Sequence, residues 1–186
     1  PEPCDIEDYK CIFAAKEGAV VAPAAGLHFS RSLISRLKIK GVKEAFVTIH
    51  SGLGAFREID VEDLTKHRMD SEQMDARQEL VDTVNAAKGA GHQVCAVGTS
   101  VLRAIATADS MGGHMKTYTG WTNKFIFPPY DFSVASSLVT NFHMPYSTML
   151  MMVAAFGGYE LVMKAYNEAV KEGYRFGCYG DAMFIL

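Results

Sequence analysis

The stretch Leu138–Met152, LVTNFHMPYSTMLMM, carries the pattern that decides the fold class. An apolar approach leads into a polar cluster that includes His143, and after Pro145 the residue Ser147 opens a long apolar run. Because proline cannot continue a preceding helix and serine caps a new one, the stretch predicts a strand, a turn and a buried helix. The turn would lie at the C-terminal end of a strand, where open α/β sheets bind ligands. A turn that merely joins two core elements explains the pattern equally well.

The same succession of strand, polar loop and helix recurs on both sides of this stretch. The run 44–50, EAFVTIH, leads into Ser51-Gly52-Leu53-Gly54, and the run 93–97 leads into Gly98-Thr99-Ser100 ahead of a helix over 101–108. This alternation indicates an α/β fold with a mainly parallel sheet. Loops at the C-terminal ends of parallel strands share one side of the sheet, so we expect His28, His50, Thr99 and His143 on one rim.

The remaining elements follow from periodicity and from capping residues. Ser30 is the expected N-cap and Gly41 the expected end of a helix over 31–40. Further helices are predicted over 75–88, 148–156 and 159–172, and short strands over 18–21, 114–119, 138–142, 174–179 and 182–186. The segment 67–72, HRMDSE, is predicted to be a polar loop. We interpret residues 1–17 as a linker and residues 18–186 as one α/β domain.

Composition narrows the functional classes. The 186 residues are 49% hydrophobic and 21% charged, which is typical of a globular domain. The formal charge of −3 gives no broad basic field, so any nucleic acid is expected to bind through a local patch or with help from elsewhere. The four cysteines form no CxxC pair, so neither a zinc framework nor a disulfide scaffold is expected. No apolar run is long enough to cross a membrane and no signal peptide is visible. The chain begins with Pro1, which suggests a fragment of a longer protein.

Seven segments, in order, resemble the motifs of the S-adenosylmethionine:tRNA ribosyltransferase-isomerase family of queuosine biosynthesis. The resemblance runs from about Gly18 to the C-terminus and is specific because the segments keep their order. The segments are AAGLHF (24–29), HSGLGAF (50–56), HRMDSE (67–72), AVGTS (96–100), GWTNKFIFPPYDF (120–132), VTNFHMPYSTMLMMVAAFGG (139–158) and YRFGCYGDAMFIL (174–186).

The resemblance implies a fold, a reaction and its partners. The family fold is a distorted α/β barrel with a small inserted β-barrel domain, and this chain resembles the C-terminal part without that insertion. The family transfers the ribosyl moiety of S-adenosylmethionine onto 7-aminomethyl-7-deazaguanine at the tRNA wobble position. The ribosyl group is isomerised to give epoxyqueuosine, and adenine and methionine are released. We therefore expect S-adenosylmethionine as co-substrate, tRNA as partner, no metal, no membrane, a monomer and a cytoplasmic location.

The implied chemistry assigns roles to individual residues. The hydrogens next to the sulfonium are acidic, so a base must remove one, and a neutral histidine suits that step. The candidates are His143, His50 and His28, although His50 could equally be a capped strand end. The candidate substrate-binding residues are Gly52, Gly54, Thr99, Ser100, Arg103, Trp121, Asn141, Thr148 and Asp181. Arg103 and the Thr99-Ser100 amides suit the methionine carboxylate, whereas Trp121 could be a core anchor and Asp181 a turn former.

Several positions depart from the family motifs. The changed residues include Ala24, Ala55, Asp70, Val101, Ala106, Asn123 and Tyr146. Losing a hydroxyl or a charge can cost a catalytic step much or little, depending on its role. The alternative hypothesis is therefore a catalytically impaired homologue that binds S-adenosylmethionine or tRNA without turnover.

Overall fold

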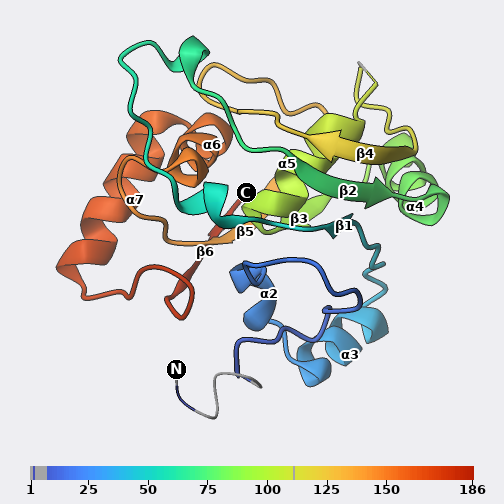
Figure 1. The fold of residues 1–186 in the computed structure, drawn as a ribbon. Coiled ribbons are helices and arrows are strands. Elements are labelled where there is room, and N and C mark those ends of the chain that lie inside the picture. The colour runs from blue at the N-terminus through green and yellow to red at the C-terminus, as the bar shows by residue number, and fades with distance from the viewer. Residues whose placement is uncertain (1, 3–7, 111) are drawn as a thin grey trace.

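The structure, a computed structural model, describes residue 2 and residues 8–110 and 112–186. Two three-stranded sheets flank the central helix α5 (Thr99–Ala108), which contacts strands of both sheets (Figure 1). The other helices of eight or more residues are α3 (Arg31–Ile39), α4 (Gln78–Gly89), α6 (Thr148–Gly157) and α7 (Tyr159–Lys171). Shorter helical pieces are α2 (Ala24–Leu27), η1 (Leu53–Phe56) and η2 (Leu64–Lys66).

The two sheets differ in strand direction. The first has the order β1 (Thr48–Ile49), β2 (Glu72–Ala76), β4 (Tyr118–Thr122), and both of its pairings are antiparallel. The second has the order β3 (Cys95–Val97), β5 (Ser137–Asn141), β6 (Ala182–Ile185), with β3 parallel and β6 antiparallel to β5. The α/β class is confirmed. The prediction of a mainly parallel sheet is wrong, since one of the four pairings between described strands is parallel.

Strand β2 and the short helix α2 are not predicted from the sequence, and β2 is the more informative of the two. Its residues EQMDA are mostly polar, yet Glu72, Met74 and Ala76 are buried in strict alternation. The β-character comes from pairing on both sides, with β1 and with β4, and not from β-branched residues. The predicted strands over 18–21 and 174–179 are not observed, and the strand predicted over 44–50 is reduced to β1.

The core surrounds α5. Leu102 on α5, Ala96 on β3, Leu138 on β5 and Met74 on β2 are each at most 1% exposed and belong to one apolar cluster. Helices α6 and α7 lie on the β5–β6 side of the molecule (Figure 1). Burial on two sides explains why the α6 sequence, TMLMMVAAFG, is apolar on nearly every face.

Capping serines define two helix starts as predicted. The backbone N–H of Leu33 donates to Ser30 Oγ at 3.1 Å, and that of Leu150 donates to Ser147 Oγ at 3.1 Å. Both bonds satisfy amides that have no partner within the helix. They fix the starts of α3 and α6.

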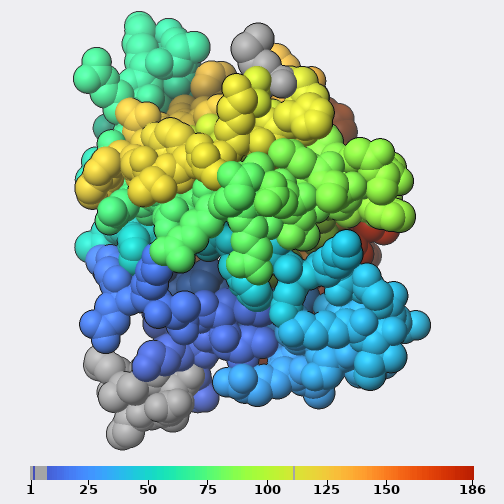
Figure 2. Space-filling view, turned by 90° about the vertical axis from the view of Figure 1, so that its right-hand side faces the viewer, coloured from blue at the N-terminus to red at the C-terminus, as the bar shows by residue number. Residues whose placement is uncertain are grey.

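The N-terminal part packs against strands of both sheets: α2 contacts β5, and Lys16 pairs with Asp75 on β2 at 3.5 Å. In Figure 2 the segment up to α3, blue to light blue, forms the lower half of the visible face, under the green and yellow region of α4, β2 and β4. Tyr9, in the expected linker, packs its ring against Tyr179 at 5.7 Å and donates to Cys178 Sγ at 3.7 Å. Residues 1 and 3–7 of that linker lie outside the described residues.

Among the described residues, no single helix combines the length and apolar character needed to cross a membrane. Together α6 and α7 reach that length, but they meet at 118°.

Candidate functional site

The candidate site lies where the parallel strands β3 and β5 end. The N–H of Gly98 donates to the carbonyl of Val139 at 2.8 Å, which places the start of α5 beside the end of β5. Gly98 has φ 104°, a conformation that favours glycine. Helix α2 packs against Gly98: a Cβ placed on this glycine would lie 3.7 Å from the Cβ of Ala25. Strand ends, a helix start and the α2 turn therefore meet at one edge.

Asn141, the last residue of β5, has its side-chain amide oriented by its surroundings. Its Nδ2 donates to the carbonyls of Gly177 at 3.0 Å, Gly180 at 3.3 Å and Cys178 at 3.5 Å. Only the nitrogen of a carboxamide can face carbonyl oxygens, so Oδ1 must be the atom that points the other way. The amide therefore has one permitted orientation.

That orientation determines which nitrogen of His28 carries the proton. Asn141 Oδ1 lies 3.1 Å from His28 Nε2. Because Oδ1 can only accept, Nε2 must donate, and in the neutral ring Nδ1 holds the lone pair. His28 follows α2 directly and is exposed, and within the described residues Asn141 is its side-chain hydrogen-bond partner. The structure thus presents an accessible basic nitrogen at the strand ends.

His143 is more enclosed than His28. Its Nε2 lies 2.7 Å from Thr140 Oγ1, and its backbone N–H donates to the hydroxyl of Tyr166 at 2.9 Å. Burial lowers the pKa of His143 to about 4, since the apolar surroundings disfavour the charged ring. The imidazole is therefore neutral near pH 7 and is fixed in place by Thr140.

A second group of contacts joins the loop after β1 to the start of α5. Ser51 Oγ lies 3.2 Å from Ser100 Oγ. The N–H of Gly52 donates to Glu72 Oε1 at 2.9 Å, and the other oxygen of Glu72 pairs with Arg103 Nη2. Both charged side chains are at most 5% exposed, and burial lowers the pKa of the Arg103 guanidinium.

These contacts change two expected roles. The Arg103 guanidinium is paired with Glu72 beneath the loop, which does not fit the expected contact with a substrate carboxylate. The N–H of Gly52 is likewise taken by Glu72. These contacts hold the loop after β1 in place.

For two further residues of the expected substrate-binding set, the sequence left a purely structural role open, as a turn former for Asp181 and as a core anchor for Trp121. Asp181 is a turn former: its carboxylate accepts from the N–H of Arg175 at 2.8 Å, and its own N–H donates back to the Arg175 carbonyl. Trp121 is not a core anchor, because it is 64% exposed on β4, an edge strand of the first sheet.

The remaining expected residues pack close to the loops. His50 lies against Gly18, where a Cβ would come within 2.8 Å of His50 Nδ1. Gly54 leaves room for the carboxylate of Asp70, which pairs with Arg57 at 3.1 Å. Thr99 and Thr148 are 6% and 3% exposed, in the first turns of α5 and α6.

The residues that depart from the family motifs are dispersed over the fold. Tyr146 is 70% exposed with φ 57°, in the turn before α6. Ala24 and Ala55 lie in the short helices α2 and η1. Ala106 is on the C-terminal half of α5, away from the strand ends.

The sequence does not give the observed contacts of two site residues. Thr140 belongs to the polar cluster before Pro145, and in the structure it fixes the ring of His143. Glu72 belongs to the predicted polar loop, where with His67 it would orient substrate or bridge loops, whereas in the structure it pairs with Arg103. Its alternation with Met74 and Ala76 was the signal that could have placed it in a buried strand.

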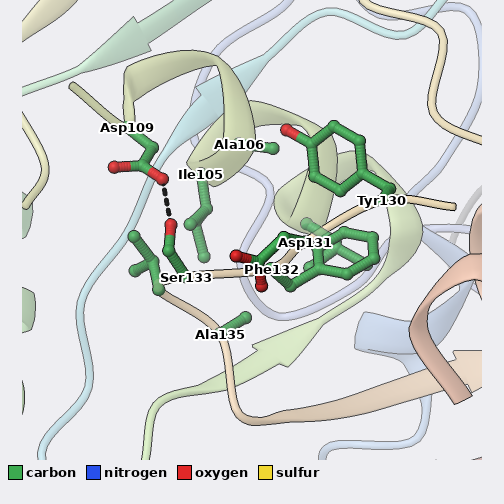
Figure 3. A pocket seen from close by; sticks show the side chains of 10 residues that line it. Ile105, Ala106, Asp109, Tyr130, Asp131, Phe132, Ser133 and Ala135 are labelled. Carbon is green, nitrogen blue, oxygen red and sulfur yellow. Dashed lines mark hydrogen bonds between the residues drawn. The ribbon is translucent and has the colours of Figure 1, made fainter. Parts of the chain in front are cut away.

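A shallow hollow lies at the opposite end of α5 (Figure 3). The side chains of Ile105, Ala106, Tyr130 and Phe132 line it, and Ser133 donates to Asp109 at its rim. Its position at the C-terminal end of α5 separates it from the candidate site. Within the described residues no group of three or more His, Cys, Asp or Glu side chains has a metal-binding arrangement.

Comparisons with known proteins agree on one family. The family model described as queuosine biosynthesis protein matches residues 2–185. The S-adenosylmethionine:tRNA ribosyltransferase-isomerase of Parabacteroides distasonis is 71% identical over 100% of this chain and 53% of its own length. The protein of the same name from Phocaeicola vulgatus is 65% identical over 98% of this chain and 52% of its own length.

A solved structure agrees with the fold. The crystal structure of S-adenosylmethionine tRNA ribosyltransferase from Thermotoga maritima is similar with a TM-score of 0.72 and 41% identity. The match covers 87% of this chain and 51% of that chain. This chain thus spans about half the length of the curated relatives it matches. On the matches to the family model and to these relatives, the chain belongs to the queuosine biosynthesis protein family.

Proposed function

We propose that the protein, in its full natural length, is an S-adenosylmethionine:tRNA ribosyltransferase-isomerase. It transfers the ribosyl moiety of S-adenosylmethionine to 7-aminomethyl-7-deazaguanine in tRNA and isomerises it to give epoxyqueuosine, adenine and methionine. The names of its relatives support the reaction class. The observation in the chain itself that carries the proposal is the basic nitrogen of His28, oriented by Asn141 at the ends of the parallel strands.

His28 is the proposed base. In this role Nδ1 removes a proton from the carbon next to the sulfonium, and the ring becomes an imidazolium. Asn141 Oδ1 accepts from Nε2–H before and after the transfer, so the ring need not turn. An exposed ring suits a base that must reach a substrate carbon.

His143 is proposed to act as a neutral side chain of the same site. With a pKa of about 4 it remains uncharged in the working pH range, so it can exchange hydrogen bonds with substrate without repelling the sulfonium. His50 and the first-turn residues Thr99 and Ser100 complete the proposed site. The helix-start amides of α5 favour an anion such as the methionine carboxylate.

The experiment is an adenine-release assay with the full-length protein, S-adenosylmethionine and tRNA that carries the deazaguanine. We expect wild-type turnover and a loss of about 10²–10⁴-fold in kcat for His28→Gln, the range typical of a general base. His92→Gln, on an exposed loop, is the matched control and should keep full activity.

Two outcomes would contradict parts of this proposal. Unchanged turnover in His28→Gln would show that another group is the base, and His143→Gln then identifies the next candidate. No adenine from the wild-type protein, with S-adenosylmethionine still bound in calorimetry, would support the catalytically impaired homologue instead. We also propose a monomer that works in the cytoplasm, which sedimentation and cell fractionation would test.

A further inference from the structure

The segment 31–43, RSLISRLKIKGVK, concentrates positive charge in an otherwise acidic chain. It contains Arg31, Arg36, Lys38, Lys40 and Lys43 and no carboxylate. The whole chain has 18 Lys and Arg against 21 Asp and Glu, so without these five cations 13 remain against 21, a charge of −8. We call residues 31–43 the α3 basic segment. An anionic polymer would be attracted to it and repelled by the net negative charge of the rest of the chain.

All five cations face solvent. Each is exposed, and α3 itself has no buried residue. Lys38 pairs with Glu44, whereas the other four make no ion pair with any residue that the structure describes. The α3 basic segment forms the light-blue lower right of the face in Figure 2. Four charges are therefore available to a partner.

The helix dipole does not account for this charge pattern. Cations stabilise the last turn of a helix, which covers Arg36 and Lys38. Arg31 occupies the first turn, where a cation is unfavourable and where acidic residues are absent, and Lys43 lies beyond the helix end. An external anion explains the whole set better than helix stability does.

The backbone of the segment is fixed at both ends. Ser30 caps the start, and Gly41, with φ 83°, ends α3 through the bonds Gly41 N–H to Lys38 O at 2.9 Å and Val42 N–H to Leu37 O at 3.0 Å. Ser30 is two residues after His28. The charges therefore begin within one turn of the proposed base.

We propose that the α3 basic segment binds the phosphate backbone of the RNA substrate beside the site. The inference rests on the proposed function for the identity of the substrate as tRNA. It adds the surface on which that RNA lies. Unpaired lysines and arginines on one exposed element are the groups that make phosphate contacts, and such contacts release counterions.

The test replaces Arg36, Lys40 and Lys43 with glutamine in the full-length protein and measures tRNA binding across a salt series. None of the three belongs to the proposed catalytic site. We expect the slope of log affinity against log salt to decrease by about two to three, and the Kd to rise about tenfold or more at 0.1 M salt. S-adenosylmethionine binding in calorimetry should stay unchanged.

The matched control removes the same charge elsewhere. Lys116, Lys164 and Lys171, all exposed, are replaced with glutamine. An equal loss of tRNA affinity in this control would overturn the proposal, because net charge alone would then be responsible. An unchanged slope of log tRNA affinity against log salt in the α3 variant would also overturn it. The same holds if the wild-type protein bound anionic phosphatidylserine vesicles as tightly as it binds tRNA.

The binding measurement is separate from catalysis. Wild-type protein that binds tRNA through α3 but releases no adenine would keep this inference and contradict the proposed activity. If the wild-type protein released adenine but the α3 variant bound tRNA as tightly as wild type, the proposed activity would stand and this inference would be contradicted.

Discussion

At the scale of single residues, Asn141 performs two tasks with one side chain. Its nitrogen ties the loop Gly177–Gly180 to the end of β5, and its oxygen orients His28. A carboxamide suits this position because it offers a donor and an acceptor on opposite sides. The site and the loop are therefore coupled through one amide.

Asn141→Ala should harm stability and activity together. The carbonyls that it contacts lose their donor, which costs about 1–3 kcal/mol in the free energy of unfolding.

Asn141→Asp separates the two tasks: the carboxylate still accepts from His28 but cannot donate to the loop. Its negative charge favours the protonated ring, so the acid limb of the adenine-release pH profile should move to higher pH. An acid limb at the wild-type position would show that Asn141 acts on the loop alone.

His143 predicts a pH dependence of stability. Its pKa is about 4 when folded, against 6.5 ordinarily. As the pH falls below 6.5, the imidazole of His143 becomes protonated in the unfolded chain but stays neutral in the folded protein. The free energy of unfolding therefore decreases between about pH 6.5 and 4, by up to about 3 kcal/mol, and this stabilisation is fully present above that range. Urea unfolding of wild type and His143→Gln at pH 7 and pH 4.5 measures it. Equal losses in the two proteins would contradict the assignment.

At the scale of elements, the buried pair of Glu72 and Arg103 joins β2 to α5 and carries the loop after β1. Desolvation of two charges offsets much of their attraction, so the pair as a whole contributes little to stability. Removing one partner is different, because it leaves a buried charge unpaired. The pair therefore determines the position of β2 relative to α5 more than it contributes to the free energy of unfolding.

Arg103→Met should lower the free energy of unfolding by about 3–5 kcal/mol. Adding Glu72→Gln removes the remaining charge while keeping an acceptor for Gly52, so the double variant should be more stable than Arg103→Met alone. Urea unfolding of the cycle gives the coupling energy. The exposed pair of Arg57 and Asp70 is the control, and Arg57→Met should cost less than about 1 kcal/mol. A double variant less stable than Arg103→Met would contradict this account.

The sequence predicted elements best where the signal is local. The cap at Ser147 and the apolar run after it placed α6 correctly, and Ser30 and Gly41 placed α3. Strand directions depend on pairing between distant segments, so the antiparallel β6 and the polar β2 could not be derived from periodicity. The same limit applies to the site.

Within the site, residue types were predictable and partners were not. His28, Asn141 and His143 were chosen by motif and position. The bond between His28 and Asn141 spans 113 residues, and no local pattern contains it. The sequence predicts that Arg103 contacts the methionine carboxylate because an arginine suits that group, and only the fold supplies the buried carboxylate that it meets instead.

At the scale of the whole molecule, the two sheets share a single core through α5. Residues of β2, β3, β5 and α5 belong to one apolar cluster, with Leu102 fully buried among them. Among the described helices, α5 has the most extensive contacts with strands of both sheets. The molecule should therefore unfold as one cooperative unit.

The variant Leu102→Ala tests whether the two sheets unfold as one cooperative unit. The cavity should lower the free energy of unfolding by about 3–5 kcal/mol. Because α5 supports both sheets, native-state hydrogen exchange should accelerate equally for the amides of Met74 on β2 and Leu138 on β5. Leu161→Ala, at a position 64% exposed on α7, is the control and should change neither. If exchange accelerated in one sheet only, the sheets would be separate units, and the site at the start of α5 would bridge two independently folding parts of the protein.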